Sequence, residues 1–192
     1  MKEDQTSKII LQNAVTLFSK KGFHGVSMRE LAAAAGCSLP SLYYYYQNKA
    51  ELFYEITVRQ FFKITDAMNK KIDLSAPPEE LYWQVIQSRK ELTGFERDVY
   101  KMALRVWLGF EDHPGAREKI MEWENKRLSA NLGLMQNALG DSPQRQDIME
   151  ILINYMENMI NKIILLDAPA DEESVKRQLH LLFSCTEKTS KT

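Results

Sequence analysis

The sequence predicts an all-α protein of about nine helices, arranged as a small N-terminal domain of three helices and a larger helical domain behind it. Apolar residues recur at intervals of three and four along most of the chain, which is the spacing of one face of an α-helix. Capping residues and glycine or proline breaks divide the chain into segments of helical length. A strand-like alternation of useful length is missing. At 192 residues, 44% of them hydrophobic, the chain can bury one moderate core or two small ones.

The first short helix with clear boundaries begins at Met28. Ser27 and Glu30 form a capping box, in which two side chains satisfy backbone N–H groups at the start of a helix. Gly36 follows a run of four alanines and can adopt the left-handed conformation that ends a helix. The segment therefore predicts a short helix followed by a tight turn.

A second short helix follows this turn at once. Ser38 is a suitable N-cap, and Pro40 is tolerated because it lies in the first turn of the helix. The small alanines before Gly36 allow the two helices to approach closely and to cross steeply, which is a helix-turn-helix arrangement. In such an arrangement the second helix points its outer side chains toward a DNA major groove, here Leu39, Ser41, Tyr43 and Tyr44.

About the first 52 residues resemble the N-terminal domain of the TetR family of bacterial transcriptional regulators. The match includes the Gly22-Phe23 turn, the Ala-Gly-x-Ser segment at 35–38, the Leu-Tyr-x-Tyr-aromatic segment at 42–46 and a lysine three residues later. Leu39 departs from the pattern, since many members carry a polar residue there. The apolar first helix of the family corresponds to Ile10, Leu11, Ala14, Leu17 and Phe18.

The resemblance implies a homodimer that regulates transcription. Because the sequence shows neither a membrane span nor the apolar core of a signal peptide, we expect the protein to stay in the cytoplasm. In this interpretation the protein is a repressor that leaves a palindromic operator when a small hydrophobic or aromatic effector binds. The choice of repressor over activator follows the habit of the family. An alternative is a DNA-bound adaptor of similar fold, whose C-terminal domain binds a protein partner and no small molecule. A closed apolar cavity of about 300 Å³ or more would favour the sensor.

A longer helix is expected from Lys49 to about Lys71. Asn48 and Glu51 repeat the capping box, and an apolar stripe follows at helical spacing: Leu52, Phe53, Ile56, Phe62, Ile64 and Met68. This helix connects a DNA-binding domain at residues 1–50 with a ligand-binding and dimerisation domain at 51–192. Breaks near 75–78, 94, 112–115, 140–143 and 167–169 predict five further helices.

The last two long helices, about 143–166 and 172–186, carry wide apolar faces. We expect them to form a four-helix interface between two chains, as the resemblance also implies. The alternative is that they complete the core of a single chain. The interface candidates are Ile148, Leu152, Tyr155, Met156, Met159, Ile163, Val175, Leu179, Leu182 and Phe183.

Ten residues are candidates for contact with DNA. Tyr43, by resemblance, and Lys49, in the first turn of its helix, are expected to bind phosphate, as Tyr45 could. Leu42 and Tyr46 are expected to fill the small core instead. The full set of candidates is Ser27, Arg29, Ser38, Leu39, Pro40, Ser41, Tyr43, Tyr44, Tyr45 and Lys49.

Candidates for an effector pocket come from aromatic and methionine side chains in the middle helices. Methionine adapts to varied apolar shapes, although core packing is the alternative role for each of these residues. The candidates are Trp83, Phe95, Met102, Trp107, Phe110, Met121, Trp123 and Met135.

Charge and composition narrow the class of protein further. The chain has a net charge of −1, but residues 1–50 hold six basic and three acidic residues, so the positive end is the end that resembles a DNA-binding domain. Its three histidines, His24, His113 and His180, lack metal-ligand or triad spacing, and a phosphate-binding loop is missing. We therefore expect no enzyme, metal or cofactor. No apolar stretch approaches the roughly 20 residues of a membrane span.

Overall fold

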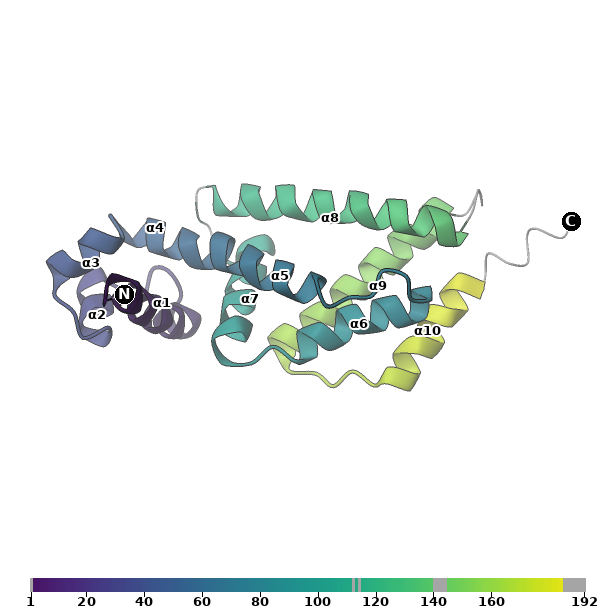
Figure 1. Cartoon of the computed structure of the whole chain (residues 1–192), viewed down its shortest axis with the longest axis horizontal. Coiled ribbons are helices and arrows are strands. Elements are labelled where there is room, and N and C mark those ends of the chain that lie inside the picture. The colour runs from purple at the N-terminus through teal and green to yellow at the C-terminus, as the bar shows by residue number, and fades with distance from the viewer. Residues whose placement is uncertain (1, 112, 114, 140–144, 185–192) are drawn as a thin grey trace, which may run out of the picture. The chain divides into compact units, whose positions relative to one another are not determined.

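The computed structural model describes residues 2–111, 113, 115–139 and 145–184, and the side chains of 5–111, 113, 115–130 and 146–184. Within these ranges the chain forms nine helices and no strand, which confirms the predicted fold class (Figure 1). One of them is continuous through α4 (Lys49–Tyr54), the π-helical turn η1 (Glu55–Gln60) and α5 (Phe61–Asn69). The others are α1 (Lys2–Lys21), α2 (Met28–Ala34), α3 (Leu39–Tyr45), α6 (Pro78–Lys90), α7 (Gly94–Trp107), α8 (Ala116–Leu139), α9 (Arg145–Leu166) and α10 (Glu172–Ser184).

The chain divides into two compact units. Unit 1 consists of residues 1–66 and 93–122, and unit 2 consists of residues 67–92 and 123–192. Two helices, α5 and α8, contribute residues to both units. None of the described helices combines the length and the apolar character needed to cross a membrane.

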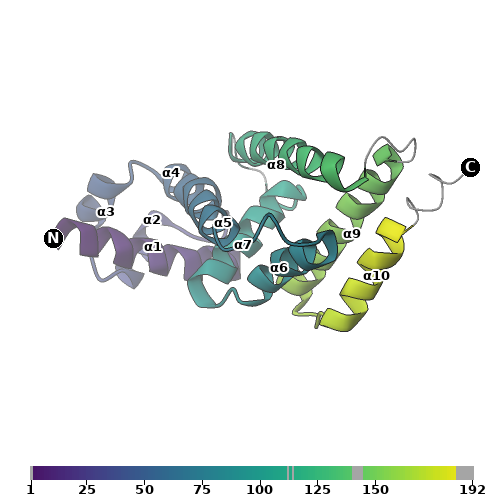
Figure 2. The same cartoon turned by 45° about the vertical axis from the view of Figure 1, so that its right-hand side comes forward.

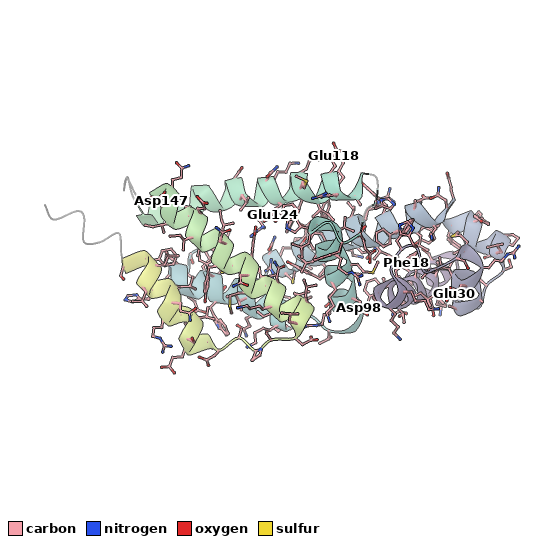
Figure 3. All side chains as sticks on the ribbon, turned by 180° about the vertical axis from the view of Figure 1, so that it is seen from behind. Phe18, Glu30, Asp98, Glu118, Glu124 and Asp147 are labelled. Carbon is pink, nitrogen blue, oxygen red and sulfur yellow. The ribbon has the colours of Figure 1, made fainter. Side chains whose placement is uncertain are left out.

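Unit 1 is built around α1. This helix packs against α2, α4 and α7, and α2 packs in turn against α3 (Figure 2). Phe18 of α1 is fully buried, and its ring meets that of Phe53 edge to face at 5.3 Å (Figure 3). The helix-turn-helix therefore shares its core with the start of the longer helix and is supported by α7.

The turn between α2 and α3 ends the first helix as predicted. Gly36 has a φ of +64°, in the left-handed region. Its N–H donates to the carbonyl of Ala33 at 3.2 Å, and the N–H of Cys37 donates to the carbonyl of Ala32 at 3.0 Å. This pair of hydrogen bonds is a Schellman motif, which satisfies the last carbonyls of a helix and requires the left-handed residue between them.

The π-helical turn changes which aromatic side chain is buried beyond it. The predicted stripe included Phe62, but Phe61 is the buried residue, with 3% of its surface exposed, and Phe62 is half-buried. The N–H of Phe61 donates to the carbonyl of Ile56, five residues back, so one extra residue enters the turn. The Phe61 ring then meets Tyr100 of α7 edge to face at 5.1 Å.

Unit 2 places α6, α9 and α10 side by side (Figures 1 and 2). Its core absorbs most of the apolar side chains that we expected at an interface between two chains. Their burial therefore requires no second chain, and only Tyr155, Met159 and Leu182 of the expected set remain half-buried. The buried ones are Ile148, Leu152, Met156, Ile163, Val175, Leu179 and Phe183.

Gly36→Ala is expected to destabilise the protein by about 1–2 kcal/mol, because alanine resists the left-handed conformation. A steric clash with the surroundings does not contribute, since no atom beyond Gly36 and its two chain neighbours lies within 4 Å of the position of the added Cβ. Urea unfolding measures the change, and Gly36→Asn is the matched control, because asparagine tolerates this conformation better. Equal losses in both variants would contradict the backbone explanation.

Candidate DNA-binding site

The predicted DNA contacts lie at the start of α2, along α3 and at the start of α4. Ser27 Oγ accepts the N–H of Glu30, and Ser38 Oγ accepts the N–H of Ser41, both at 3.2 Å. Both serines therefore act as N-caps, as predicted. None of the ten candidates belongs to the buried core. Six are exposed and four half-buried, the latter being Leu39, Ser41, Tyr45 and Lys49.

The four tyrosines of α3 and its C-cap separate into an outer and an inner group. Tyr43 and Tyr44 are 46% and 72% exposed. Tyr46 is buried, as is Leu42, which confirms the expectation for these two residues. The Tyr46 hydroxyl lies 3.3 Å from Ser7 Oγ of α1, and burial raises the pKa of Tyr46. One side of α3 therefore packs into the protein core, and the other side exposes aromatic side chains to solvent.

The Lys49 ammonium is held within the protein. It donates to the carbonyls of Phe23 and Val26, at 2.8 and 2.9 Å, and lies 4.4 Å from the centre of the Phe23 ring. These carbonyls belong to the loop between α1 and α2, and Val26 directly precedes the N-cap Ser27. Lys49 therefore connects the start of α4 to the start of α2. Sequence spacing carries no signal for this contact, because its acceptors are backbone atoms more than twenty residues away.

His113 adds a second connection to the start of α4. Its Nε2 lies 2.9 Å from the carbonyl oxygen of Ala50, and since a carbonyl can only accept, Nε2 carries the proton and donates. The imidazole packs against Phe23 and Phe53, with ring centres 5.7 and 5.4 Å away. We call Phe18, Phe23, Phe53 and His113 the aromatic junction. In the sequence His113 lies in the break at 112–115, and its spacing carries no signal for this contact.

Charge near the helix-turn-helix is partly neutralised within the chain. Lys21 at the end of α1 forms an ion pair with Glu30 of α2. The Lys21 ammonium, together with the backbone N–H of Ser27, holds the pKa of Glu30 below its usual value. Arg29 is exposed on the same helix and has no ion pair among the described residues. Its guanidinium is therefore available to a phosphate.

Unit 2 contains a cavity of about 390 Å³. Among the predicted pocket residues whose side chains the structure describes, Trp123 alone lines it. Trp83 is buried elsewhere in α6, and Phe95, Met102, Trp107, Phe110 and Met121 belong to unit 1. The side chain of Met135 lies outside the described residues. The lining residues are Asn69, Ile72, Leu74, Leu81, Tyr82, Val85, Arg89, Trp123, Lys126, Arg127, Ala130, Met149, Leu152, Ile153 and Met156.

Polar groups are few in this cavity. Burial raises the pKa of Tyr82 to about 12, so its hydroxyl keeps its proton at neutral pH. Arg127 forms an ion pair with Glu124 of the same helix, with Nε donating to Oε2 at 2.9 Å. Arg89 lines the cavity with only 2% of its surface exposed. Sequence analysis missed Arg89, which was not singled out from the other basic residues.

Comparison with known proteins agrees with this geometry. Residues 10–56 match the family model described as bacterial regulatory proteins of the tetR family. The chain is 38% identical over 153 residues to the biofilm operon icaADBC HTH-type negative transcriptional regulator IcaR of Staphylococcus aureus (strain Newman), covering 78% of this chain and 79% of that protein. It is 32% identical over 123 residues to IcaR of Staphylococcus epidermidis, and this match covers 64% of this chain and 63% of that relative. The chain therefore spans less than two thirds of the length of the S. epidermidis protein.

Solved structures show the same fold over nearly the whole length. A TetR-like transcriptional regulator from Rhodococcus sp. RHA1 superposes with a TM-score of 0.71 at 21% identity, covering 93% of each chain. The multidrug binding protein EbrR complexed with ethidium superposes with a TM-score of 0.59 at 22% identity, covering 92% of this chain and 97% of that one. From the helix-turn-helix, the extent of the match to IcaR and the shared fold, we conclude that this chain belongs to the TetR family of bacterial DNA-binding transcriptional regulators.

Proposed function

We propose that this regulator is a homodimeric repressor that binds a palindromic operator and releases it when a small hydrophobic or aromatic effector binds. The observation that carries the proposal is the outer face of α3, where Tyr43 and Tyr44 are exposed between two capped helix starts. In this proposal residues 1–50 bind DNA, residues 51–192 bind effector and dimerise, and the helix from Lys49 to about Lys71 connects them. The printed name of IcaR, a negative regulator, supports repression.

The ten candidate residues divide by the type of contact that we propose. Tyr43, Tyr45 and the first amides of α4 hold phosphates on one strand, and the start of α2 with Arg29 holds the facing strand. Tyr44 and Ser41 approach base edges or sugars. Leu39 and Pro40 can make apolar contact with a thymine methyl group. Because Ser27, Ser38 and Lys49 are engaged within the protein, they act mainly by placing the backbone that meets the phosphates.

The dimer interface that we propose includes the apolar side chains that unit 2 leaves uncovered. On α9 the side chains at 151, 155, 159 and 166 lie on one side of the helix, next to the buried face, and Ile151 and Leu166 are 55% and 73% exposed. On α10, Leu181 is 60% exposed and Leu182 is half-buried. Two copies of this surface can pair by two-fold symmetry, which a palindromic operator also requires.

A cavity of about 390 Å³, partly open to solvent, supports an effector sensor over a protein-binding adaptor by its volume, which lies in the range of about 300–1,000 Å³ usual for ligand sites. The printed title of the EbrR structure, a multidrug binding protein with ethidium, supports the same function. We propose that effector binding shifts the population toward a second conformation of the dimer. In that conformation the distance between the two DNA-binding domains does not match the distance between the operator half-sites. A coupling free energy of about 3 kcal/mol would weaken operator binding by more than a hundredfold.

The α8 helix is the proposed route between cavity and DNA-binding domain. It begins at Ala116, three residues after His113 of the aromatic junction, and it carries Trp123, Lys126 and Arg127 of the cavity lining. A displacement of α8 by effector would therefore reach the hydrogen bond between His113 and Ala50 at the start of α4. The route uses one continuous helix and the hydrogen bond between His113 and Ala50.

Arg29→Met and Lys49→Met are expected to weaken binding to the DNA upstream of the regulator's own gene in different ways. Loss of a phosphate contact at Arg29 lowers the slope of log affinity against log salt concentration by about one unit. Loss of Lys49 instead lowers the melting temperature and the affinity with little change of slope, because its ammonium binds carbonyls. Fluorescence anisotropy and circular dichroism measure these quantities.

Lys63→Met, which removes an exposed cation of α5, is the matched control and should change neither quantity. A Lys49 variant with unchanged stability and a slope lower by one unit would show that Lys49 binds phosphate directly. An Arg29 variant with the wild-type slope would remove Arg29 from the proposed contacts.

Ile151→Glu combined with Leu181→Glu is expected to convert the dimer to a monomer, because each chain would bring two carboxylates, four in all, into an apolar interface. Sedimentation velocity measures the mass. Phe110→Glu changes a side chain of unit 1 that is 72% exposed and should leave the dimer intact. A double variant that remains dimeric while folded would place the interface elsewhere.

A further inference from the structure

The cavity of unit 2 contains a buried cation without a carboxylate partner. Arg89 is 2% exposed, and its NH1 donates to the carbonyl of Val85 at 3.2 Å and to Ser88 Oγ at 2.7 Å. Its Nε is buried and has no hydrogen-bond partner among the described residues, and no ion pair there joins Arg89 to an acid. A buried guanidinium without a counter-ion is costly, so an anion that enters the cavity would be favoured.

The other charged residues of the lining increase this preference. Arg127 is already compensated by Glu124, and Lys126 is exposed at the solvent side of the lining. The described lining contains no aspartate or glutamate. The described lining therefore combines basic side chains with apolar walls, which come mainly from Leu81, Val85, Met149, Leu152, Ile153 and Met156.

We propose that the cavity binds a monocarboxylate with an apolar body, and that the carboxylate pairs with the Arg89 guanidinium. The inference rests on the proposed function, since it names the chemical class of the effector. A guanidinium presents parallel N–H donors that match the two oxygens of a carboxylate, and the bond is strengthened by charge. The apolar body fills the space between α6 and α9, and the volume of about 390 Å³ limits the effector to a small molecule.

Ligand charge is the variable that tests this proposal. Isothermal titration calorimetry of the full chain without DNA would compare decanoate, decanol and decylammonium, which share one alkyl chain. A second series would compare 2-naphthoate with 2-naphthol. In at least one series we expect the carboxylate to bind at least about tenfold more tightly than its alcohol, since hydrogen bonds to charged groups contribute about 1.5–3 kcal/mol. Decylammonium should bind more weakly than decanol.

Arg89→Met keeps the length and the apolar stem of the side chain and removes the charge. It should abolish the preference for carboxylate over alcohol while the affinity for the alcohol stays within about threefold. Lys126→Met is the matched control and should keep most of the preference, because Lys126 is exposed. Without ligand, Arg89→Met should not lower the melting temperature, since removal of an unpaired buried charge relieves a cost.

Three results would overturn the inference. The wild-type protein could bind neither carboxylate better than its alcohol, or it could bind decylammonium most tightly. The third result is a folded Arg89→Met variant that keeps the full preference for carboxylate. The wild-type comparison stands even where the variant fails to fold. Carboxylate binding that leaves operator affinity unchanged would support the inference and count against effector control in the proposed function. A failure of the carboxylate inference can therefore be distinguished from a failure of the proposed function.

Discussion

The placement of the DNA-binding residues depends on how the Lys49 ammonium is held. Two carbonyls of the loop between α1 and α2 and the face of Phe23 surround it, so the start of α4 and the start of α2 are tied together at one point. Val26, which supplies one carbonyl, precedes the cap of α2. The orientation of α2, and through the Schellman turn that of α3, follows from this connection. A partly buried ammonium with strong acceptors tolerates little displacement, because each lost hydrogen bond would leave its charge poorly compensated.

The aromatic junction extends this connection to the rest of unit 1. Phe23 contacts Phe53 edge to face at 5.0 Å, and both pack on His113, whose Nε2 donates to Ala50 beside Lys49. Contacts between aromatic rings contribute about 0.5–1.5 kcal/mol each beyond burial of area. The segment before α8 is thereby coupled to the start of α4. In the proposed function, effector binding would act on this contact without touching the DNA-binding residues.

Features set by local sequence were predicted well, and features set by distant packing were not. Ser27, Gly36 and Asn48 act on backbone groups a few residues away, so the sequence alone located these helix ends. The π-helical turn, which exchanges Phe62 for Phe61, depends on packing against α7 and has no local signature. The cavity is lined by α6, α8, α9 and the end of α5 with the loop after it, so aromatic content along the sequence carries little information about its lining. Arg89 could have been found, because it follows Leu81 and Val85 at intervals of four and so lies on an apolar face.

Footprinting on the DNA upstream of the regulator's own gene tests the central claim most directly. A dimer whose α3 helices enter successive major grooves should protect two symmetric half-sites whose centres lie about one helical turn, or 34 Å, apart. Protection should decline with salt and should be lost in Tyr43→Ala, which removes the exposed ring without touching the core. Uniform protection of all sequences, or a symmetric footprint that survives loss of the Tyr43 ring, would contradict the function assigned to this surface.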